Sequence, residues 1–355
     1  MSIARVFIKN FRLFKELDLD LNKKNLLITG LNGSGKTTVL EAVNLLISRK
    51  SIRTRNLKEC IKEDTAGFSL GLEIKNKNEV LTIKAAKQTN KRISIKTTTG
   101  NSSKTKESLP IVQFIQAKDL RMIEGETELR RGFFNKTMFH VEHSSEIDYK
   151  NYKKALNQRN ISLKRKSSDS ELKVWNEALI ETGNILAEKQ KSFFKTIFKK
   201  SLEEKREKGK AQDTFLDQAK VVFMKGWPGE VSFGRALSES EEKDRALGYS
   251  SIGPHRLDFK YYINNKLAKT LLSRGQQKLL IILSYFKFND ILNANNKTGV
   301  IYLIDDITSE LDQENLAIAL EQAMELKAQL VITAIKGKSL SNTTPFLGKF
   351  RQLNL

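Results

Sequence analysis

One eight-residue stretch limits the folds open to this chain more than any other. Residues 30–37 read Gly-Leu-Asn-Gly-Ser-Gly-Lys-Thr, which is the pattern of a glycine-rich loop that binds phosphates. A short apolar run at residues 25–29 precedes the loop, and the apolar residues of 38–47 recur at helical spacing. Strand, loop and helix are the setting that this motif requires, so the sequence predicts a phosphate-binding loop in preference to a chance glycine-rich turn.

The residue types of the loop suit separate parts of a nucleoside triphosphate. Gly30, Gly33 and Gly35 allow backbone conformations closed to residues with a side chain, so successive N–H groups can converge on phosphate oxygens at a helix N-terminus. Lys36 adds a positive charge for the β and γ phosphates, and the Thr37 hydroxyl is a ligand for Mg²⁺. We therefore expect ATP to be bound by Gly30, Leu31, Asn32, Gly33, Ser34, Gly35, Lys36, Thr37 and Thr38.

A second segment far along the chain supplies the acids that this chemistry needs. Residues 300–306 read Val-Ile-Tyr-Leu-Ile-Asp-Asp, the pattern of a buried parallel strand that ends in two carboxylates. In a phosphate-loop NTPase such a strand holds Mg²⁺ through its first acid. We expect Asp305 to do so with Thr37, and Asp306 to orient or polarise the attacking water. An acid pair at a strand end is common alone, but together with residues 30–37 it indicates an ATPase with Lys36 and Asp306 as catalytic residues.

A third segment has the character of an anion site. Residues 272–278 read Leu-Ser-Arg-Gly-Gln-Gln-Lys and open a helix predicted over residues 278–292. Ser273 and Gly275 at a helix N-terminus offer a hydroxyl, free N–H groups and the positive end of the helix dipole. Two such sites in one chain imply either two phosphates or one phosphate that is shared.

Periodicity elsewhere predicts an α/β head with an antiparallel β subdomain. Alternating apolar residues at 3–8 and 17–21 indicate two short strands around a turn, and three more alternating runs follow. An apolar run at 111–115 ends at Gln116. The three additional runs are residues 68–75, 79–85 and 92–98.

The middle of the chain changes to helical spacing and predicts an inserted α-helical lobe. Apolar residues between 128 and 209 keep mostly three- or four-residue steps, and residues 213–223 form one more amphipathic segment. A strand at 259–263 leads into Asn264-Asn265, the expected hairpin turn. We therefore divide the chain into an N-terminal half of the head (1–127), a helical lobe (128–245) and a C-terminal half of the head (246–355).

The net charge of the chain favours one class of binding partner. The 355 residues carry 62 Lys and Arg against 41 Asp and Glu, a net charge of +21, and residues 151–210 hold 16 basic and 8 acidic residues. Such a surplus favours a polyanion such as DNA, although lysine used as a default surface residue would give the same count. Cys60 is the single cysteine, and neither a membrane-spanning run nor a signal-like apolar segment occurs. We expect a cytoplasmic protein with no disulfide and no membrane partner.

Taken in order, these segments resemble the ABC class of ATPases. Residues 30–37, Gln116, 272–278, 304–312 and the Thr333 region stand in ABC order. Three further motifs are similar to the RecF family of bacterial recombination mediators, and the similarity spans essentially the whole chain. They are Ser-Ile-Arg-Thr at 51–54, Leu-Arg-Arg-Gly-Phe-Phe at 129–134 and Gly-Pro-His-Arg at 253–256.

The resemblance implies roles for further residues. Gln116 would couple the γ-phosphate and Mg²⁺ to the helical lobe, Ser273 and Gly275 would form the signature that covers the nucleotide of a second copy, and Asp312 would lie on the turn that crosses the dimer interface. In related chromosome-maintenance and recombination ATPases an Asn-Phe-Arg near the N-terminus lies beside the nucleotide, so Arg12 either touches phosphate or caps an exposed hairpin.

Two residues depart from the family pattern. Asp306 stands where ABC ATPases usually have glutamate, and Thr333 stands where many have histidine. A shorter acid and a missing imidazole favour slow hydrolysis, which suits a timer or switch.

The family resemblance implies an ATP-driven dimer that clamps duplex DNA near single-strand gaps and releases it on hydrolysis. Partners implied are RecO and RecR, with recombinase loading and induction of the SOS damage response. One alternative is a nucleotide-gated DNA-binding scaffold with negligible hydrolysis. A second, the ATPase subunit of a transporter, is disfavoured by the basic helical lobe.

Overall fold

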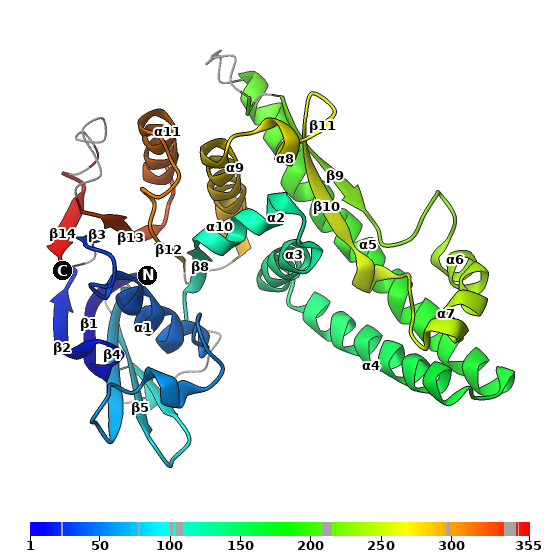
Figure 1. The fold of residues 1–355 in the computed structure, drawn as a ribbon, viewed down its shortest axis with the longest axis horizontal. Helices are drawn as coiled ribbons and strands as arrows, with labels where there is room; N and C mark the ends of the chain where they lie inside the picture. The colour runs from blue at the N-terminus through cyan, green and yellow to red at the C-terminus, as the bar shows by residue number, and fades with distance from the viewer. Residues whose placement is uncertain are drawn as a thin grey trace. The chain divides into compact units, whose positions relative to one another are not determined.

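The chain folds into two compact units in the computed structural model. Unit 1 comprises residues 1–120 and 273–355, and unit 2 comprises residues 121–272 (Figure 1). The structure describes residues 1–22, 24–76, 79–99, 102–103, 109–207, 215–216, 218–295, 299–336, 346 and 348–355.

A parallel five-stranded sheet organises unit 1. Its order is β14-β3-β13-β12-β8. Ile304 at the end of β12 is in register with Ile115 of β8 and Ile332 of β13, and Gly30 of β3 with Ile335. The carboxyl ends therefore share one edge, which is where α/β sheets bind ligands. The bounds are β3 Asn25–Gly30, β8 Ile111–Ile115, β12 Val300–Ile304, β13 Gln329–Ile335 and β14 Phe350–Asn354.

A second, antiparallel sheet has the order β2-β1-β4-β5-β6-β7. It contains the two N-terminal strands and the three alternating runs predicted from the sequence. Along β4 and β5 buried side chains alternate with more exposed ones, because successive side chains of a strand point to opposite faces of the sheet. The bounds are β1 Ser2–Phe11, β2 Phe14–Asp20, β4 Gly67–Asn76, β5 Glu79–Gln88, β6 Ser94–Thr99 and β7 Ser102–Ser103.

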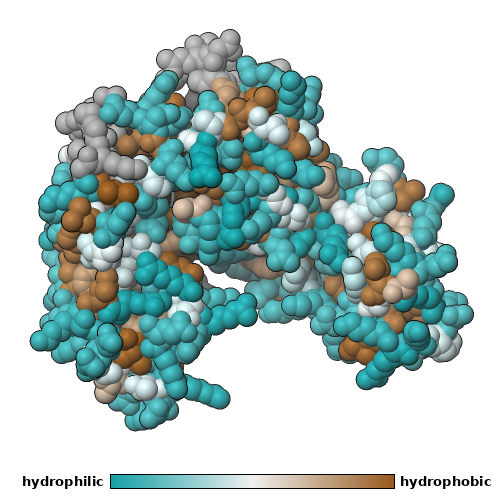
Figure 2. Space-filling view, in the orientation of Figure 1, coloured by the Kyte–Doolittle hydropathy of each residue, from teal (hydrophilic) through white to brown (hydrophobic). Residues whose placement is uncertain are grey.

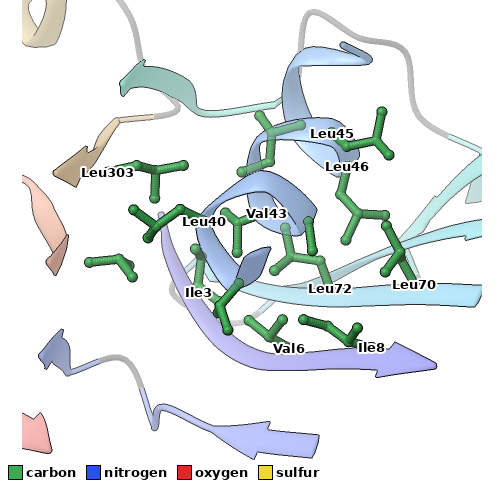
Figure 3. Close-up of a cluster of buried hydrophobic side chains, with 14 of the residues drawn as sticks. Ile3, Val6, Ile8, Leu40, Val43, Leu45, Leu46, Leu70, Leu72 and Leu303 are labelled. Carbon is green, nitrogen blue, oxygen red and sulfur yellow. The ribbon is translucent and has the colours of Figure 1, made fainter. Parts of the chain in front are cut away.

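Helix α1 (Lys36–Ser48) shares one hydrophobic core with both sheets. Leu40, Val43 and Leu46 gather with Ile3 of β1 and Leu72 of β4, as Figure 3 shows. Residues of β12 such as Leu303 belong to the same cluster. Because this helix is buried on nearly all sides, its sequence is apolar beyond a single stripe.

The remaining helices of unit 1 include α9 (Arg274–Lys287), α10 (Asn289–Asn295) and α11 (Gln313–Met324), with the 3₁₀ turns η1 (Leu57–Cys60) and η3 (Ala117–Leu120). Tyr302 of β12 stacks edge-on against Phe286 of α9 at 5.3 Å between ring centroids. The sequence placed this helix at residues 278–292. It begins four residues earlier because Ser273 caps it, and it ends at Lys287.

Unit 2 is built on long helices with a small antiparallel sheet, β11-β10-β9 (Figure 1). Its core gathers aromatic side chains: Phe134 packs edge-on against Phe193 at 5.2 Å and lies 6.1 Å from Phe259. The helices are α2 Arg121–Glu124, α3 Thr127–Val141, α4 Ser144–Arg165, α5 Asp169–Glu207, α6 Phe233–Glu239, α7 Glu241–Leu247 and α8 Ala268–Leu271, with the 3₁₀ turn η4 Pro254–Arg256. The strands are β9 Ala219–Met224, β10 Asp258–Ile263 and β11 Lys266–Leu267.

The domain boundaries differ from those expected. The units change at 120/121 and 272/273, where the sequence suggested 127/128 and 245/246. The later boundary moves because β10 pairs with β9, which keeps residues 246–272 with the helices. Most of the second half of the amphipathic segment predicted at 213–223 therefore belongs to strand β9. Asn264 and Asn265 form the expected turn, both with left-handed backbones (φ 46° and 64°).

The surface in Figure 2 is mostly hydrophilic, with separate apolar patches. Among the described residues, every helix is too short or too polar to cross a lipid bilayer.

Candidate functional site

Glycine conformations shape the loop between β3 and α1. Gly33 and Gly35 have φ of 83° and 100°, the left-handed region that side chains disfavour. A Cβ on Gly35 would lie 2.7 Å from the ring of Phe14, so the N-terminal hairpin closes tightly on the loop. The Ser34 hydroxyl is buried and has no hydrogen-bond partner in the described part of the chain. The loop thus has the backbone shape and an unused polar atom suited to a phosphate group.

Lys36 is buried under the same loop. Its Nζ donates to the carbonyl oxygens of Gly30 and Leu31, both at 2.8 Å. These bonds hold the ammonium inside the cradle formed by the loop, the position from which a lysine of this motif reaches phosphate oxygens.

The predicted Mg²⁺ ligands meet in space although 268 positions separate them. Thr37 Oγ1 donates to Asp305 Oδ1 and Oδ2 at 2.9 and 3.0 Å. Thr333 Oγ1, from the adjacent strand, donates to Asp305 Oδ1 at 2.9 Å. Asp305 is thus oriented from both sides.

A hydroxyl and a carboxylate in this arrangement fit a magnesium ion, whose other ligands come from phosphate oxygens and water in such sites. No cluster of three or more His, Cys, Asp or Glu ligands occurs within the described residues. The donor set therefore suits a cation that arrives with a nucleotide.

Asp306 adopts an unusual backbone beside this pair. Its φ of 47° is left-handed, a conformation that non-glycine residues adopt infrequently and often near functional sites. Its N–H donates to Thr333 Oγ1 at 2.7 Å, and its Oδ1 accepts from Thr308 Oγ1 at 3.2 Å. Thr333, which stands where many ABC ATPases have histidine, therefore links Asp305 and Asp306.

Gln116 follows β8, directly beside the acid strand. The Asp305 N–H donates to the Ile115 carbonyl at 2.8 Å, and the Gln116 N–H donates to Asp119 Oδ2 at 2.9 Å. The structure therefore brings Gln116 to the same edge as the loop and the acids.

Ser273 begins α9 with a reciprocal capping box. Its Oγ accepts from Gln276 N at 3.3 Å, and Gln276 Oε1 accepts from Ser273 N at 3.0 Å. Ser273 itself is exposed, so the helix tip is accessible to a ligand.

Gly275 is buried, unlike its neighbour. A Cβ there would lie 2.7 Å from the Glu310 carbonyl oxygen, so glycine permits α9 to approach the loop after β12. Asp312 caps α11 through Asn315 N at 2.8 Å and is exposed. Close packing explains why residue 275 is glycine, and helix capping explains Asp312. Both residues lie near the exposed N-terminus of α9.

Arg12 makes an ion pair that the sequence analysis did not anticipate. Its Nη2 and Nε donate to the Glu41 carboxylate at 2.9 and 3.1 Å, and its Nη1 donates to the Glu59 carbonyl at 2.9 Å. The bond to Glu41 raises the pKa of Arg12, although burial opposes the shift. These contacts go beyond a simple hairpin cap, and the contact of Arg12 with phosphate stays a prediction.

Glu41, Thr308 and Lys278 are the site residues that sequence reasoning missed. Glu41 had a signal in the sequence, because it is the one carboxylate of α1 and lies between apolar residues. It is fully buried in the structure and therefore needs a partner. Lys278 is 4% exposed and binds the Asp306 carbonyl, a contact that no local pattern predicts.

The three motifs that resemble RecF have structural roles. Ser51 donates to Glu41 Oε1 at 2.5 Å, which ties the first motif to α1. In unit 2, Arg130 forms a buried ion pair with Asp258 at 2.6 Å. His255 contacts the Tyr152 hydroxyl through Nδ1 at 2.6 Å.

Solved structures share this fold. A structure described as the recombination mediator protein RecF with ATP in the RecFOR pathway aligns with a TM-score of 0.74 at 22% identity, over 95% of this chain and 93% of that one. A second RecF structure, with ATPrS, gives 0.76 at 21% identity over 96% and 93%. An Smc head bound to the C-winged helix domain of ScpA gives 0.51 at 13% identity over 96% and 92%. The fold is that of an ABC-type ATPase head with a helical insertion.

Sequence comparison identifies the family. A family model described as "RecF/RecN/SMC N terminal domain" matches residues 2–354. DNA replication and repair protein RecF of Cellvibrio japonicus is 28% identical over 348 residues, covering 96% of this chain and 93% of that protein. RecF of Yersinia pseudotuberculosis is 28% identical over 353 residues, covering 98% and 96%. The chain belongs to the RecF/RecN/SMC family, as a RecF-type member.

Proposed function

We propose that this chain is an ATP-dependent DNA-binding protein of recombinational repair and replication-fork maintenance. The observation that carries the proposal is the contact of Thr37 Oγ1 with both oxygens of Asp305, at 2.9 and 3.0 Å, directly beside the glycine-rich loop. The names of the RecF relatives supply the biological context.

In this proposal the residues of the loop bind ATP through backbone N–H groups, and Lys36 moves from the Gly30 and Leu31 carbonyls to phosphate oxygens. Thr37, Asp305 and Gln116 hold the metal. Mg²⁺, when bound with the nucleotide, supplies charge neutralisation at the phosphate oxygens. Asp306 orients the attacking water, for which its left-handed backbone gives a fixed direction.

A second copy of the chain completes the site. The exposed Ser273 offers a hydroxyl, and α9 offers the positive end of a 14-residue helix. Arg274, whose side chain is 76% exposed, is next to it and adds a positive charge. ATP bound between two copies would thus hold a homodimer, and hydrolysis would remove the contacts that favour it. Asp312 and Gly275 would lie close to this interface.

DNA is the proposed polyanionic partner. The net charge of +21 and the basic residues between 151 and 210 support it. Preference for gaps, cooperation with RecO and RecR in recombinase loading, and SOS induction are carried over from the RecF family. The structural neighbours' description within the RecFOR pathway supports the same assignment.

Turnover should be weak and stimulated by DNA. Asp306 is one carbon shorter than glutamate, and Thr333 is fully buried and engaged with Asp305 and the Asp306 N–H. Thr333 therefore cannot replace a histidine that reaches the γ-phosphate. The same facts favour the second candidate, a nucleotide-gated DNA-binding scaffold that hardly hydrolyses ATP.

Sedimentation with ATP, ADP and DNA tests the proposal. The wild type should dimerise with ATP and not with ADP. Asp306→Asn should keep ATP-dependent dimers while losing turnover, because the nucleotide cage persists and the water is not oriented. Lys36→Ala should lose both.

The result separates the candidates. A monomer in saturating ATP would overturn the clamp. Residual turnover that is unchanged by Lys36→Ala would instead identify the scaffold, because that signal would not come from this site.

A further inference from the structure

Lys278 of α9 is a buried cation that contacts the loop following the acid strand β12. It is 4% exposed, and its Nζ lies 2.6 Å from the Asp306 carbonyl, 2.6 Å from the Ser309 carbonyl and 3.2 Å from Ser309 Oγ. Burying an ammonium is unfavourable unless its donors are satisfied. The three acceptors match the three N–H donors of lysine.

These contacts fix the turn that directs the Asp306 carboxylate. Ser309 N donates to the Asp306 carbonyl at 3.2 Å, so the ammonium binds the two ends of one short turn. Asp306 and Glu310 both have left-handed backbones, with φ of 47° and 65°. A strained turn persists only where its surroundings hold it, and Lys278 is one such constraint.

Helix α9, which carries Lys278, begins at the exposed N-cap residue Ser273. Lys278 follows Ser273 by five residues on α9, about 7.5 Å along the axis. Gly275 packs against the Glu310 carbonyl, and Arg274 lies 3.7 Å from the Glu310 carboxylate. Through these contacts a displacement of the tip would be passed to the turn that carries Asp306.

We propose that Lys278 is a positioning residue for Asp306, through which α9 couples its Ser273 tip to ATP turnover in the same chain. The proposal rests on the proposed function, because it takes Asp306 as the residue that orients water. It adds that a ligand bound at Ser273 changes the position of the Asp306 carboxylate in the same chain.

Lys87 offers a matched control in the antiparallel sheet. It is 8% exposed, and its Nζ also binds three backbone carbonyls, those of Gln88, Thr89 and Lys91. Lys87→Met removes an equivalent buried ammonium and leaves residues 273–310 unchanged. Both variants should lower the thermal midpoint, but only Lys278→Met should change catalysis.

The experiment compares full-length Lys278→Met, Lys278→Arg, Lys87→Met and Asp306→Asn, and the double variant Lys278→Met/Asp306→Asn. Affinity is measured with a non-hydrolysable ATP analogue, and turnover in single-turnover reactions with DNA. Lys278→Met should keep its affinity within about threefold while kcat falls about 10- to 100-fold, the effect of a misplaced catalytic group. The double variant should have the same residual single-turnover rate as Asp306→Asn alone, because both substitutions act through one carboxylate.

Lys278→Arg covers the case in which the methionine variant does not fold. It keeps a charged donor, but a planar guanidinium cannot reproduce the three bonds of an ammonium. It should retain affinity and lose several-fold in kcat.

Three outcomes would overturn the inference: wild-type kcat in a folded Lys278 variant, affinity and kcat falling together, or a further loss in the double variant. If Asp306→Asn itself keeps wild-type turnover, the proposed function fails instead.

Discussion

The hydroxyl of Thr333 lies 2.9 Å from Asp305 Oδ1. Thr333 Oγ1 also accepts a hydrogen bond from the Asp306 N–H at 2.7 Å, so one buried threonine connects both acids. Many ABC ATPases have histidine at this position, whereas this chain has the shorter Thr333, which is fully buried on β13.

Replacing Thr333 with valine should destabilise unit 1. Valine has the same shape but leaves the partly buried Asp306 N–H without its acceptor, which costs at most about 1–3 kcal/mol. Cys60, the single cysteine, reports this unfolding, because it is fully buried and burial raises the pKa of its thiol to about 11. Alkylation of Cys60 in increasing urea should shift to a lower midpoint. Thr333→Ser, which keeps the hydroxyl, is the control, and equal midpoints for the valine variant and the wild type would contradict the prediction.

Arg12→Met should destabilise the hairpin and α1 strongly. It leaves the fully buried Glu41 carboxylate without its ion-pair partner, a loss of about 3 kcal/mol. The double variant Arg12→Met/Glu41→Leu should recover most of it, since no charge stays buried. Calorimetry measures both.

An exposed pair on the same sheet provides the comparison. Arg5 pairs with Asp18, and their side chains are 52% and 39% exposed. Arg5→Met should therefore change the stability much less than Arg12→Met does, because the exposed pair is screened by solvent. If Arg12→Met is no more destabilising than Arg5→Met, the buried pair is not important for stability.

His255 should make unit 2 less stable in acid. Because the Ser250 carbonyl only accepts, Nε2 carries the proton and Nδ1 accepts from the Tyr152 hydroxyl. Burial lowers the pKa of His255 from 6.5 to about 4. Between those values the unfolded state binds the proton and the folded state does not, so stability falls as pH decreases from 6.5 to 4, by roughly 3 kcal/mol at most.

Fluorescence can follow that transition selectively, since both tryptophans, Trp175 and Trp227, belong to unit 2. Carboxylates titrate in the same range, so the relevant quantity is the difference between wild type and His255→Gln. The variant should lose the part of the pH dependence that belongs to the imidazole. Parallel curves for the two proteins would refute the assignment.

DNA affinity should depend steeply on salt. If the basic residues between 151 and 210 neutralise phosphates, log Kd should change linearly with log salt, with a slope of about 0.9 for each phosphate contacted on duplex DNA. Fluorescence anisotropy between 50 and 200 mM salt, about a 10³-fold change for six contacts, measures this slope. A flat profile would remove the electrostatic role of these residues.

The sequence alone determined the class of the head and predicted the segments of its candidate site. The loop at residues 30–37, the acids at 305 and 306 and the alternating strands each depend on neighbouring residues, whose types set backbone conformation and phosphate recognition locally. The α/β class and the RecF-type resemblance were accordingly predicted correctly from these segments.

Only the tertiary structure decided how the segments are held. Arg12 finds Glu41 from 29 positions away, Lys278 binds the carbonyl of Asp306 from 28 positions away, and β9 pairs with β10 and so moves the domain boundary to 272/273. The physical reason is that a buried charge or an unpaired strand edge must find a partner, and which partner comes within reach depends on the packing of the whole core.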